Sequence, residues 1–307
     1  MQTPVTPDEP EPSGYLTQYT LPLVLSIYLV ACRPEAQENK PTFDAIECRL
    51  APTKSIIVTA RPKKPVKQKK KIYLTFDDGP NRGTKNVLDI VQQENVPVTF
   101  FIVGEHVFAS AGQAAVWDSL KMAKNIELCN HSYTHAHNRY DKFYEEPVNV
   151  VKDMERTKDS LLPDNNIVRA PGRNSWRIDS LHYTDIRKSK AAMDSLQKAG
   201  FVVMGWDLEW HFDPKTYAVK NTADELLTQI DSVFTHKRTK KPDNLVLLAH
   251  DQAYRSSSDS LQLRDFIQKL KKKDEYELSL VSNYPDALKK RTDTLKTKEV
   301  RQGLDSL

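Results

Sequence analysis

The sequence predicts an α/β fold in which strands and helices alternate between residues 71 and 288. Seven short apolar runs have the length and composition of strands, and the segments between them carry apolar residues at helical spacing. Polar residues capable of chemistry follow several of the runs directly. Strands that alternate with helices form parallel βαβ units. Seven strands favour an incomplete βα barrel, although an open doubly wound sheet shows the same alternation.

The seven predicted strands are rich in valine, isoleucine, leucine and phenylalanine. They lie at residues 72–76, 98–103, 126–129, 167–169, 201–206, 245–249 and 278–281. Five helices are predicted between them, with apolar stripes through residues 87–91, 147–162, 191–199, 226–233 and 261–270. A polar connection at 173–190 exceeds ordinary loop length. It is consistent with a functional rim or lid and with a flexible insertion.

The segments outside this alternation have their own character. Residues 20–31 form an apolar stretch too short to span a bilayer comfortably, and it ends in a lipoprotein-like box at Cys32. Residues 1–32 are therefore predicted to be a lipoprotein signal, with Cys32 lipidated and the protein exported to a bacterial membrane surface. The stretch is preceded by acidic rather than basic residues. It therefore stays open whether the lipoprotein-like box is a chance match and whether Met1 is the true start.

Residues 33–70 are predicted to be a Pro/Lys-rich linker, and residues 289–307 a charged tail. Seven positive charges lie in residues 61–71, and without them the net charge of +4 becomes −3. The basicity is local, so a solvated tether is favoured over nucleic-acid binding. Cys48 and Cys129 could pair in an oxidising compartment, but the sequence leaves this open.

Two adjacent carboxylates, Asp77 and Asp78, stand where the first predicted strand ends and Gly79-Pro80 forces a turn. Neighbouring carboxylates repel each other unless their roles are separated. A cation bound by one, with the other left as a base, would separate them. An ordinary acidic turn is the competing interpretation.

His131 and His135 lie four residues apart, a spacing that puts two imidazoles on one face of a helical turn. They follow the predicted strand at 126–129, as Asp78 follows the strand at 72–76. In a βα barrel both positions lie at the rim formed by the C-terminal ends of the strands. Two histidines and one carboxylate make a three-ligand set with an open position, as in hydrolytic zinc sites. The same set could hold Co²⁺, Ni²⁺ or Fe²⁺.

Further strand ends supply an arginine and a third histidine. Arg169 could pair with Asp77 and keep that base ionised and oriented, although a surface ion pair is the commoner role. His250 is a candidate general acid, which Asp207 at the neighbouring strand end could hold. Trp206 and Trp210 could form an aromatic wall for a sugar ring, or belong to the core.

Four motifs together resemble those of the NodB-like polysaccharide deacetylases, carbohydrate esterase family 4. They are TFDDGP at 75–80, HSYTH at 131–135, RAPG at 169–172 and LLAHD at 247–251. The resemblance covers roughly residues 71–288. It implies a distorted (β/α)7 barrel, the NodB homology domain, with a divalent metal that is often zinc.

Carried over by position, the resemblance assigns Asp77 as the base and His250 as the acid. Asp78, His131 and His135 would bind the metal, Arg169 would hold Asp77, and the Gly172 N–H would help to bind the oxyanion. Two features depart from the family pattern. The segment Trp206–Trp210 is compressed, so either Asp207 or Glu209 could support His250. Gly172 stands where an aromatic residue is frequent, which would open the substrate groove.

The predicted function is metal-dependent removal of N-acetyl groups from an envelope or extracellular glycan, such as peptidoglycan or another N-acetylglucosamine polymer. Two alternatives stay open. One is an O-acetyl esterase acting on xylan with the same site. The other is a non-catalytic glycan-binding module, which only the compressed Trp206–Trp210 segment favours.

Overall fold

The computed structural model describes residues 68–288. The predicted signal at 1–32, most of the predicted linker and the predicted tail at 289–307 lie outside the described residues, as do Cys32 and Cys48. Cys129 is buried. Among residues 68–288, no helix combines the length and the apolar character that crossing a bilayer requires.

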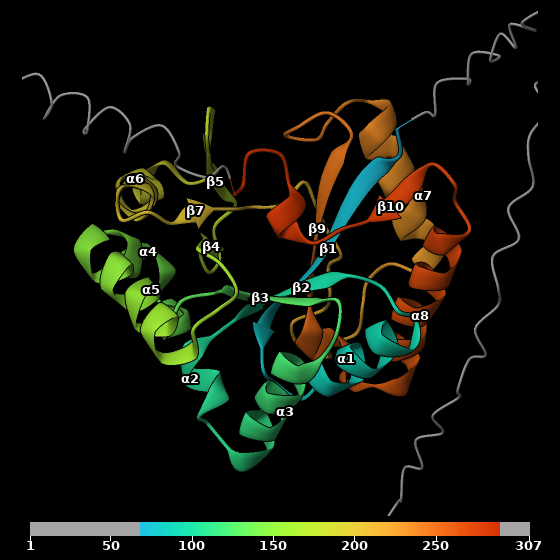
Figure 1. The fold of residues 1–307 in the computed structure, drawn as a ribbon, viewed down its shortest axis with the longest axis horizontal. Coiled ribbons are helices and arrows are strands. Elements are labelled where there is room, and N and C mark those ends of the chain that lie inside the picture. Colours follow the sequence, from blue (N-terminus) through green and yellow to red (C-terminus); the bar gives the residue numbers. More distant parts are fainter. Residues whose placement is uncertain (1–67, 289–307) are drawn as a thin grey trace, which may run out of the picture. The chain divides into compact units, whose positions relative to one another are not determined.

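A curled sheet of ten strands runs through the described part of the chain, in the order β6-β5-β7-β4-β3-β2-β1-β9-β8, with β10 beside β1 (Figure 1). All pairs are parallel except those that β5 makes with β6 and β7. The strands are β1 (Lys70–Gly79), β2 (Val98–Ile102), β3 (Ile126–Asn130), β4 (Ile167–Val168), β5 (Ser175–Ile178), β6 (Leu181–Thr184), β7 (Val202–Val203), β8 (Leu208–Glu209), β9 (Asn244–His250) and β10 (Tyr276–Leu278).

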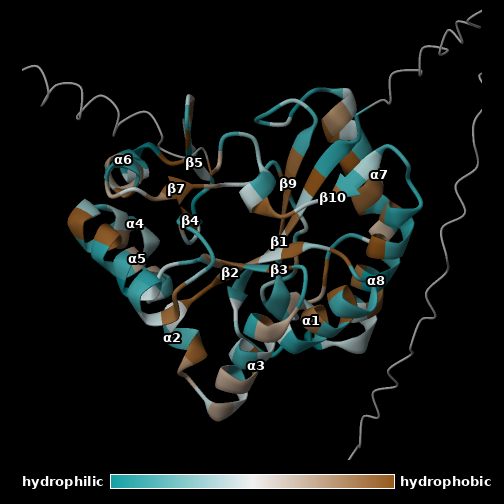
Figure 2. Ribbon diagram, in the orientation of Figure 1, coloured by the Kyte–Doolittle hydropathy of each residue, from teal (hydrophilic) through white to brown (hydrophobic). Residues whose placement is uncertain are grey.

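Helices connect most of the parallel strands. They are α1 (Thr84–Gln93), α2 (Gly104–Val107), α3 (Ala111–Met122), α4 (Tyr140–Tyr144), α5 (Pro147–Leu161), α6 (Lys190–Lys198), α7 (Ala223–Thr235) and α8 (Ser257–Lys271). In Figure 2 hydrophobic and hydrophilic residues alternate around α8, as expected for a helix with one face on a core. The predicted α/β class is confirmed, and each of the seven predicted strands overlaps an observed one.

The long connection at 173–190 is folded rather than a flexible insertion, and its residue Asp185 lines a pocket at the strand ends, in agreement with the predicted rim. It contains the antiparallel hairpin β5–β6, and every residue of β5 is buried. The sequence also did not predict α3, because only Trp117 and Leu120 of its residues are buried and its apolar stripe is correspondingly weak.

The alternation of side chains along β1 determines which of its residues face the interior of the curled sheet. Ile72, Leu74 and Phe76 belong to the core cluster that includes residues of α1, α7 and α8. Tyr73 points the other way, into a second cluster inside the curled sheet. Because side chains alternate along a strand, Asp77 faces the same interior as Tyr73. Asp77 also pairs in register with His250 of the neighbouring strand β9.

Candidate active site

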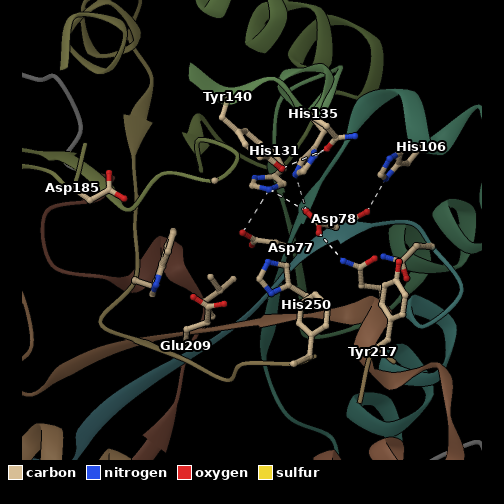
Figure 3. Close-up of a pocket in the computed structure, with 17 residues that line it drawn as sticks. Asp77, Asp78, His106, His131, His135, Tyr140, Asp185, Glu209, Tyr217 and His250 are labelled. Carbon is tan, nitrogen blue, oxygen red and sulfur yellow. Dashed lines mark hydrogen bonds and ion pairs between the residues drawn. The ribbon is translucent and has the colours of Figure 1, made fainter. Parts of the chain in front are cut away.

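A pocket of about 570 Å³ opens at the C-terminal ends of the parallel strands. Figure 3 shows acidic and imidazole side chains converging on it from several elements. The sequence-predicted residues that line it are Asp77, Asp78, His131, His135, Gly172, Trp206, Glu209 and His250. The remaining lining residues include Tyr140, Phe212, Tyr217 and Gln252, none of which was predicted from the sequence.

Asp78, His131 and His135 form a group able to hold a metal ion, with one ligand atom of each within 4.8 Å of the others. The Asp78 Oδ1 atom lies 3.1 Å from His135 Nε2 and 3.4 Å from His131 Nε2. This oxygen is buried and has no hydrogen-bond partner in the described part of the chain. Burial would raise the pKa of Asp78, but the neighbouring imidazoles of His131 and His135 outweigh it and hold that pKa well below its usual range.

Both imidazoles are oriented through their second nitrogen. His131 Nδ1 lies 2.9 Å from the Arg169 carbonyl oxygen, and His135 Nδ1 lies 3.0 Å from Asn138 Oδ1. A ring nitrogen that donates to an oxygen leaves the other nitrogen unprotonated and free to bind a metal. In both rings this second nitrogen, Nε2, faces Asp78.

The prediction that His131 and His135 share a helical turn is wrong. Ser132 has φ of 72°, and residues 135–138 form a left-handed turn with φ between 49° and 55°. The segment between the histidines is held by Asp153 of α5. Its carboxylate accepts hydrogen bonds from the Ser132 hydroxyl, from the Tyr133 N–H at 2.9 Å and from the Thr134 hydroxyl at 2.9 Å. The two rings therefore meet through a loop that another helix fixes.

Asp77 is buried and pairs with Arg169, whose Nη1 lies 2.7 Å from Asp77 Oδ1. The guanidinium is fully buried and also donates to the Thr75 hydroxyl and to the carbonyl oxygens of Met204 and Gly205. The other carboxylate oxygen of Asp77, Oδ2, lies 3.6 Å from His131 Nε2. Asp77 is thus a fixed carboxylate immediately beside the possible metal ligands.

His250 closes the pocket on the β9 side, with its ring 5.2 Å from that of Phe212. Its Nδ1 atom is buried and has no hydrogen-bond partner among residues 68–288. Glu209 of β8 lines the same pocket (Figure 3).

The prediction that Asp207 holds His250 is wrong. Its carboxylate accepts hydrogen bonds from the backbone N–H groups of Lys240 and Val246, at 2.7 and 2.8 Å. The register of β8 with β9 pairs Glu209 with Leu248, so Asp207 lies two residues further from the rim, outside the pocket lining.

The two predicted tryptophans have different places. Trp206 lines the pocket and is partly buried. Trp210 is a core residue, 1 % exposed, which packs against Tyr254 and Phe266 and donates from Nε1 to the Asn221 carbonyl. Its predicted contact with a sugar ring is therefore wrong.

Burial of Asp207 makes the stability of the domain depend on pH. Burial raises the pKa of this carboxyl to about 6, against the smaller opposing effect of its two backbone hydrogen bonds. The folded state then binds more protons than the unfolded state between pH 4 and 6, so the free energy of unfolding falls as pH rises through that window. We expect a loss of roughly 2–3 kcal/mol. Urea unfolding of the wild type and of Asp207→Asn at pH 4.5 and 7 tests this. If the free energy of unfolding of the variant fell with pH as much as that of the wild type, the dependence would belong to other groups.

Comparison with known proteins shows which family the chain resembles. Residues 64–174 match the family model described as polysaccharide deacetylase. The match supports the family predicted from the motifs, the NodB-like polysaccharide deacetylases of carbohydrate esterase family 4, and it contains the first three of those motifs.

Two curated relatives illustrate the sequence similarity. The YheN protein of Bacillus subtilis is 29% identical over 189 residues, which cover 59% of this chain and 58% of YheN. The peptidoglycan-N-acetylglucosamine deacetylase of Bacillus cereus is 27% identical over 195 residues, covering 60% of this chain and 61% of the relative. The chain thus spans about three fifths of the length of these relatives.

Solved structures show the same fold. A Streptococcus mutans CE4 esterase is 23% identical, with a TM-score of 0.52 over 69% of this chain and 86% of its own. The catalytic domain of a peptidoglycan N-acetylglucosamine deacetylase from Eubacterium rectale is 21% identical, with a TM-score of 0.52 over 76% of this chain and 97% of its own.

Proposed function

We propose that this NodB-like domain is a metal-dependent hydrolase that removes N-acetyl groups from an N-acetylglucosamine polymer, with peptidoglycan as the first candidate. The observation that carries the proposal is the pairing of two differently held carboxylates in one pocket. Asp78 presents an unpartnered buried oxygen to two imidazoles, whereas Asp77 is paired with a buried arginine. The named activity of the Bacillus cereus relative supports the choice of glycan.

The three possible ligands fit a divalent cation. Two neutral imidazoles and one carboxylate are a donor set typical of hydrolytic zinc sites, and they leave coordination positions open. Co²⁺, Ni²⁺ and Fe²⁺ accept the same donors. When bound, the cation would supply a Lewis acid for the acetyl carbonyl.

The other groups of the pocket can carry the proton transfers. Asp77 would take a proton from the water that attacks the acetyl carbon, since its orientation is fixed by Arg169. The Gly172 N–H would donate to the oxyanion. His250, in register with Asp77 across β1 and β9, would protonate the departing amine as the C–N bond breaks. The products would be acetate and a free amino sugar. Glu209, and not Asp207, is the carboxylate that lines the pocket together with His250, and its Oε1 lies 3.2 Å from His211 Nδ1.

Hydrolysis of O-acetyl groups on xylan is the second candidate. It is favoured by the similarity of a bifunctional xylanase/deacetylase from Pseudobutyrivibrio xylanivorans, which is 46% identical over 66 residues, 22% of this chain and 10% of the relative. A non-catalytic glycan-binding module is disfavoured, because the proposed base, acid and metal ligands are all present and all line one pocket.

Acetate release from a panel of glycans tests the proposal. The panel contains peptidoglycan, N-acetylglucosamine oligomers and acetylated xylan, and metal content is measured on the same preparation. The proposal expects acetate from the N-acetylated glycans, loss of that release on chelation, and its return with Zn²⁺. Release from xylan alone would favour the esterase, and release that is indifferent to chelators would contradict metal dependence.

We also propose that the protein is exported and anchored to a bacterial membrane through lipidated Cys32. The support is the apolar stretch at 20–31 and the small residues before this cysteine. Labelled palmitate should be incorporated by the full chain and not by Cys32→Ser. Equal labelling of both would contradict the anchor.

Gln252 is expected to affect metal affinity. Its Nε2 donates to Asp78 Oδ2 at 3.2 Å, which leaves Oδ1 as the oxygen that faces both imidazoles. Removing such a partner of a ligand typically weakens metal binding about 10–100-fold. We expect Gln252→Leu to raise the Zn²⁺ dissociation constant by that factor in competition with a chelating dye. Gln268→Leu on the exposed side of α8 serves as control, and equal affinities of both variants would contradict the role.

A further inference from the structure

Tyr140 takes up the space that the missing side chain of Gly172 leaves. A Cβ atom built on Gly172 would lie 3.1 Å from Tyr140 Cδ1 and 3.2 Å from Cε1 and Cγ. Such distances are tighter than ordinary contact, so a side chain at 172 would push the Tyr140 ring away. Both residues line the pocket. Gly172 itself is exposed and lines the pocket, so the ring of Tyr140 from α4 fills only part of the space that a side chain at 172 would take.

The position of Tyr140 follows from the loop that carries a metal-ligand candidate. His135 begins the left-handed turn at 135–138, and Tyr140 begins α4 two residues after it. The rings of His135 and Tyr140 pack edge to face, with centroids 5.8 Å apart. Figure 3 shows Tyr140 on the same wall of the pocket as His131 and His135.

The exposed edge of Tyr140 is polar. Its hydroxyl lies 3.5 Å from Asn138 Oδ1, and Asn138 lines the pocket as well. A tyrosine hydroxyl is protonated at neutral pH and can donate a hydrogen bond. A half-buried ring with a protonated hydroxyl suits a ligand that combines an apolar face with hydroxyl groups. A pyranose ring has both.

We propose that Tyr140 is a substrate-binding residue, the wall against which the reacting sugar of the glycan packs. The inference rests on the proposed function for the identity of that sugar. It adds that substrate binding depends on the pair Tyr140 and Gly172, because only a residue without a side chain at 172 leaves the ring in place.

A double-mutant cycle tests the pair. Tyr140→Ala is expected to lower kcat/KM for an N-acetylglucosamine tetramer about 10–100-fold, mainly through KM, whereas Tyr140→Phe keeps the ring and loses less. Gly172→Ala retains the backbone N–H, and its expected loss is about 10-fold in the wild type. In the Tyr140→Ala background the same change should cost several-fold less, since the ring that it displaces is already absent and only the backbone strain at the positive φ of Gly172, 62°, remains. Equal losses in both backgrounds would overturn the pairing.

Direct binding separates failure of this inference from failure of the proposed function. The tetramer is titrated calorimetrically into Asp77→Asn, with and without Tyr140→Ala, and the Zn²⁺ dissociation constant and urea midpoint are measured on each variant. Tyr140→Ala should weaken tetramer binding about 10-fold and leave metal affinity unchanged. Tyr183→Ala, an exposed tyrosine of β6 outside the pocket lining, is the control.

Each outcome decides a different statement. A wild type that releases no acetate but binds the tetramer through Tyr140 would remove the proposed function and keep the inference. Acetate release and tetramer binding that are both unchanged in Tyr140→Ala would overturn the inference alone. A wild type that neither releases acetate nor binds the tetramer would overturn both.

Discussion

Asp77→Asn is expected to lower kcat about 10³-fold, within the range of losses seen when a general base is removed. Asparagine has the shape of aspartate but cannot take the proton of the attacking water. Its carbonyl oxygen can still accept from Arg169 Nη1, which lies 2.7 Å from Asp77 Oδ1. The change therefore removes basicity with little change in the surrounding contacts.

The metal provides the control for this variant. Asp77 is not one of the three residues whose ligand atoms gather within 4.8 Å, so Asp77→Asn should bind Zn²⁺ with unchanged stoichiometry. Asp118→Asn, on the exposed surface of α3, should behave as the wild type in both assays. Acetate release by Asp77→Asn within about threefold of the wild type would contradict the assignment of Asp77 as the base. Loss of the metal together with the activity would mean that Asp77 is a ligand.

The residues of the site that could be predicted are those at strand ends. Asp77 and His250 lie at or near the C-terminal ends of long, buried strands. The alternation of side chains along each strand and the parallel pairing of the strands are therefore enough to bring them to one rim. Asp207 could not be placed in this way. The strand beside it, β8, has only two residues, and its register against β9 decides which of Asp207 and Glu209 lines the pocket. Register of so short a strand leaves no periodic signal in the sequence.

Other site residues do not lie at the end of a predicted strand. Gln252 and Tyr140 lie in a 3-10 turn and at the start of a five-residue helix, where local sequence does not fix the direction of a side chain. Asp153 belongs to a helix that the sequence predicted, but its contact with the loop 132–134 depends on how that helix packs. Tertiary packing therefore determines the part of the site that orients the proposed metal ligands.

Arg169→Met is expected to destabilise the domain by about 3–5 kcal/mol, because it leaves the Asp77 carboxylate buried without its counter-ion. Arg169 is 0 % exposed, and Asp77 is 2 % exposed. The guanidinium also donates to the Thr75 hydroxyl and lies 4.1 Å from the Phe101 ring centroid. Methionine fills most of this volume but supplies no donor, so the loss should come mainly from the uncompensated charge.

The double variant Asp77→Asn/Arg169→Met isolates that charge. Neutralising both partners removes the unpaired carboxylate, and we expect urea unfolding to recover part of the stability lost in Arg169→Met alone. The double variant also keeps the test possible if Arg169→Met does not fold. A single variant with the urea midpoint of the wild type would show that Asp77 is solvated or protonated without Arg169. A double variant no more stable than Arg169→Met would assign the loss to packing around Phe101 and the Thr75 hydroxyl. Recovery would instead show that this ion pair holds a costly buried carboxylate in place at the pocket, where the proposed reaction needs a base.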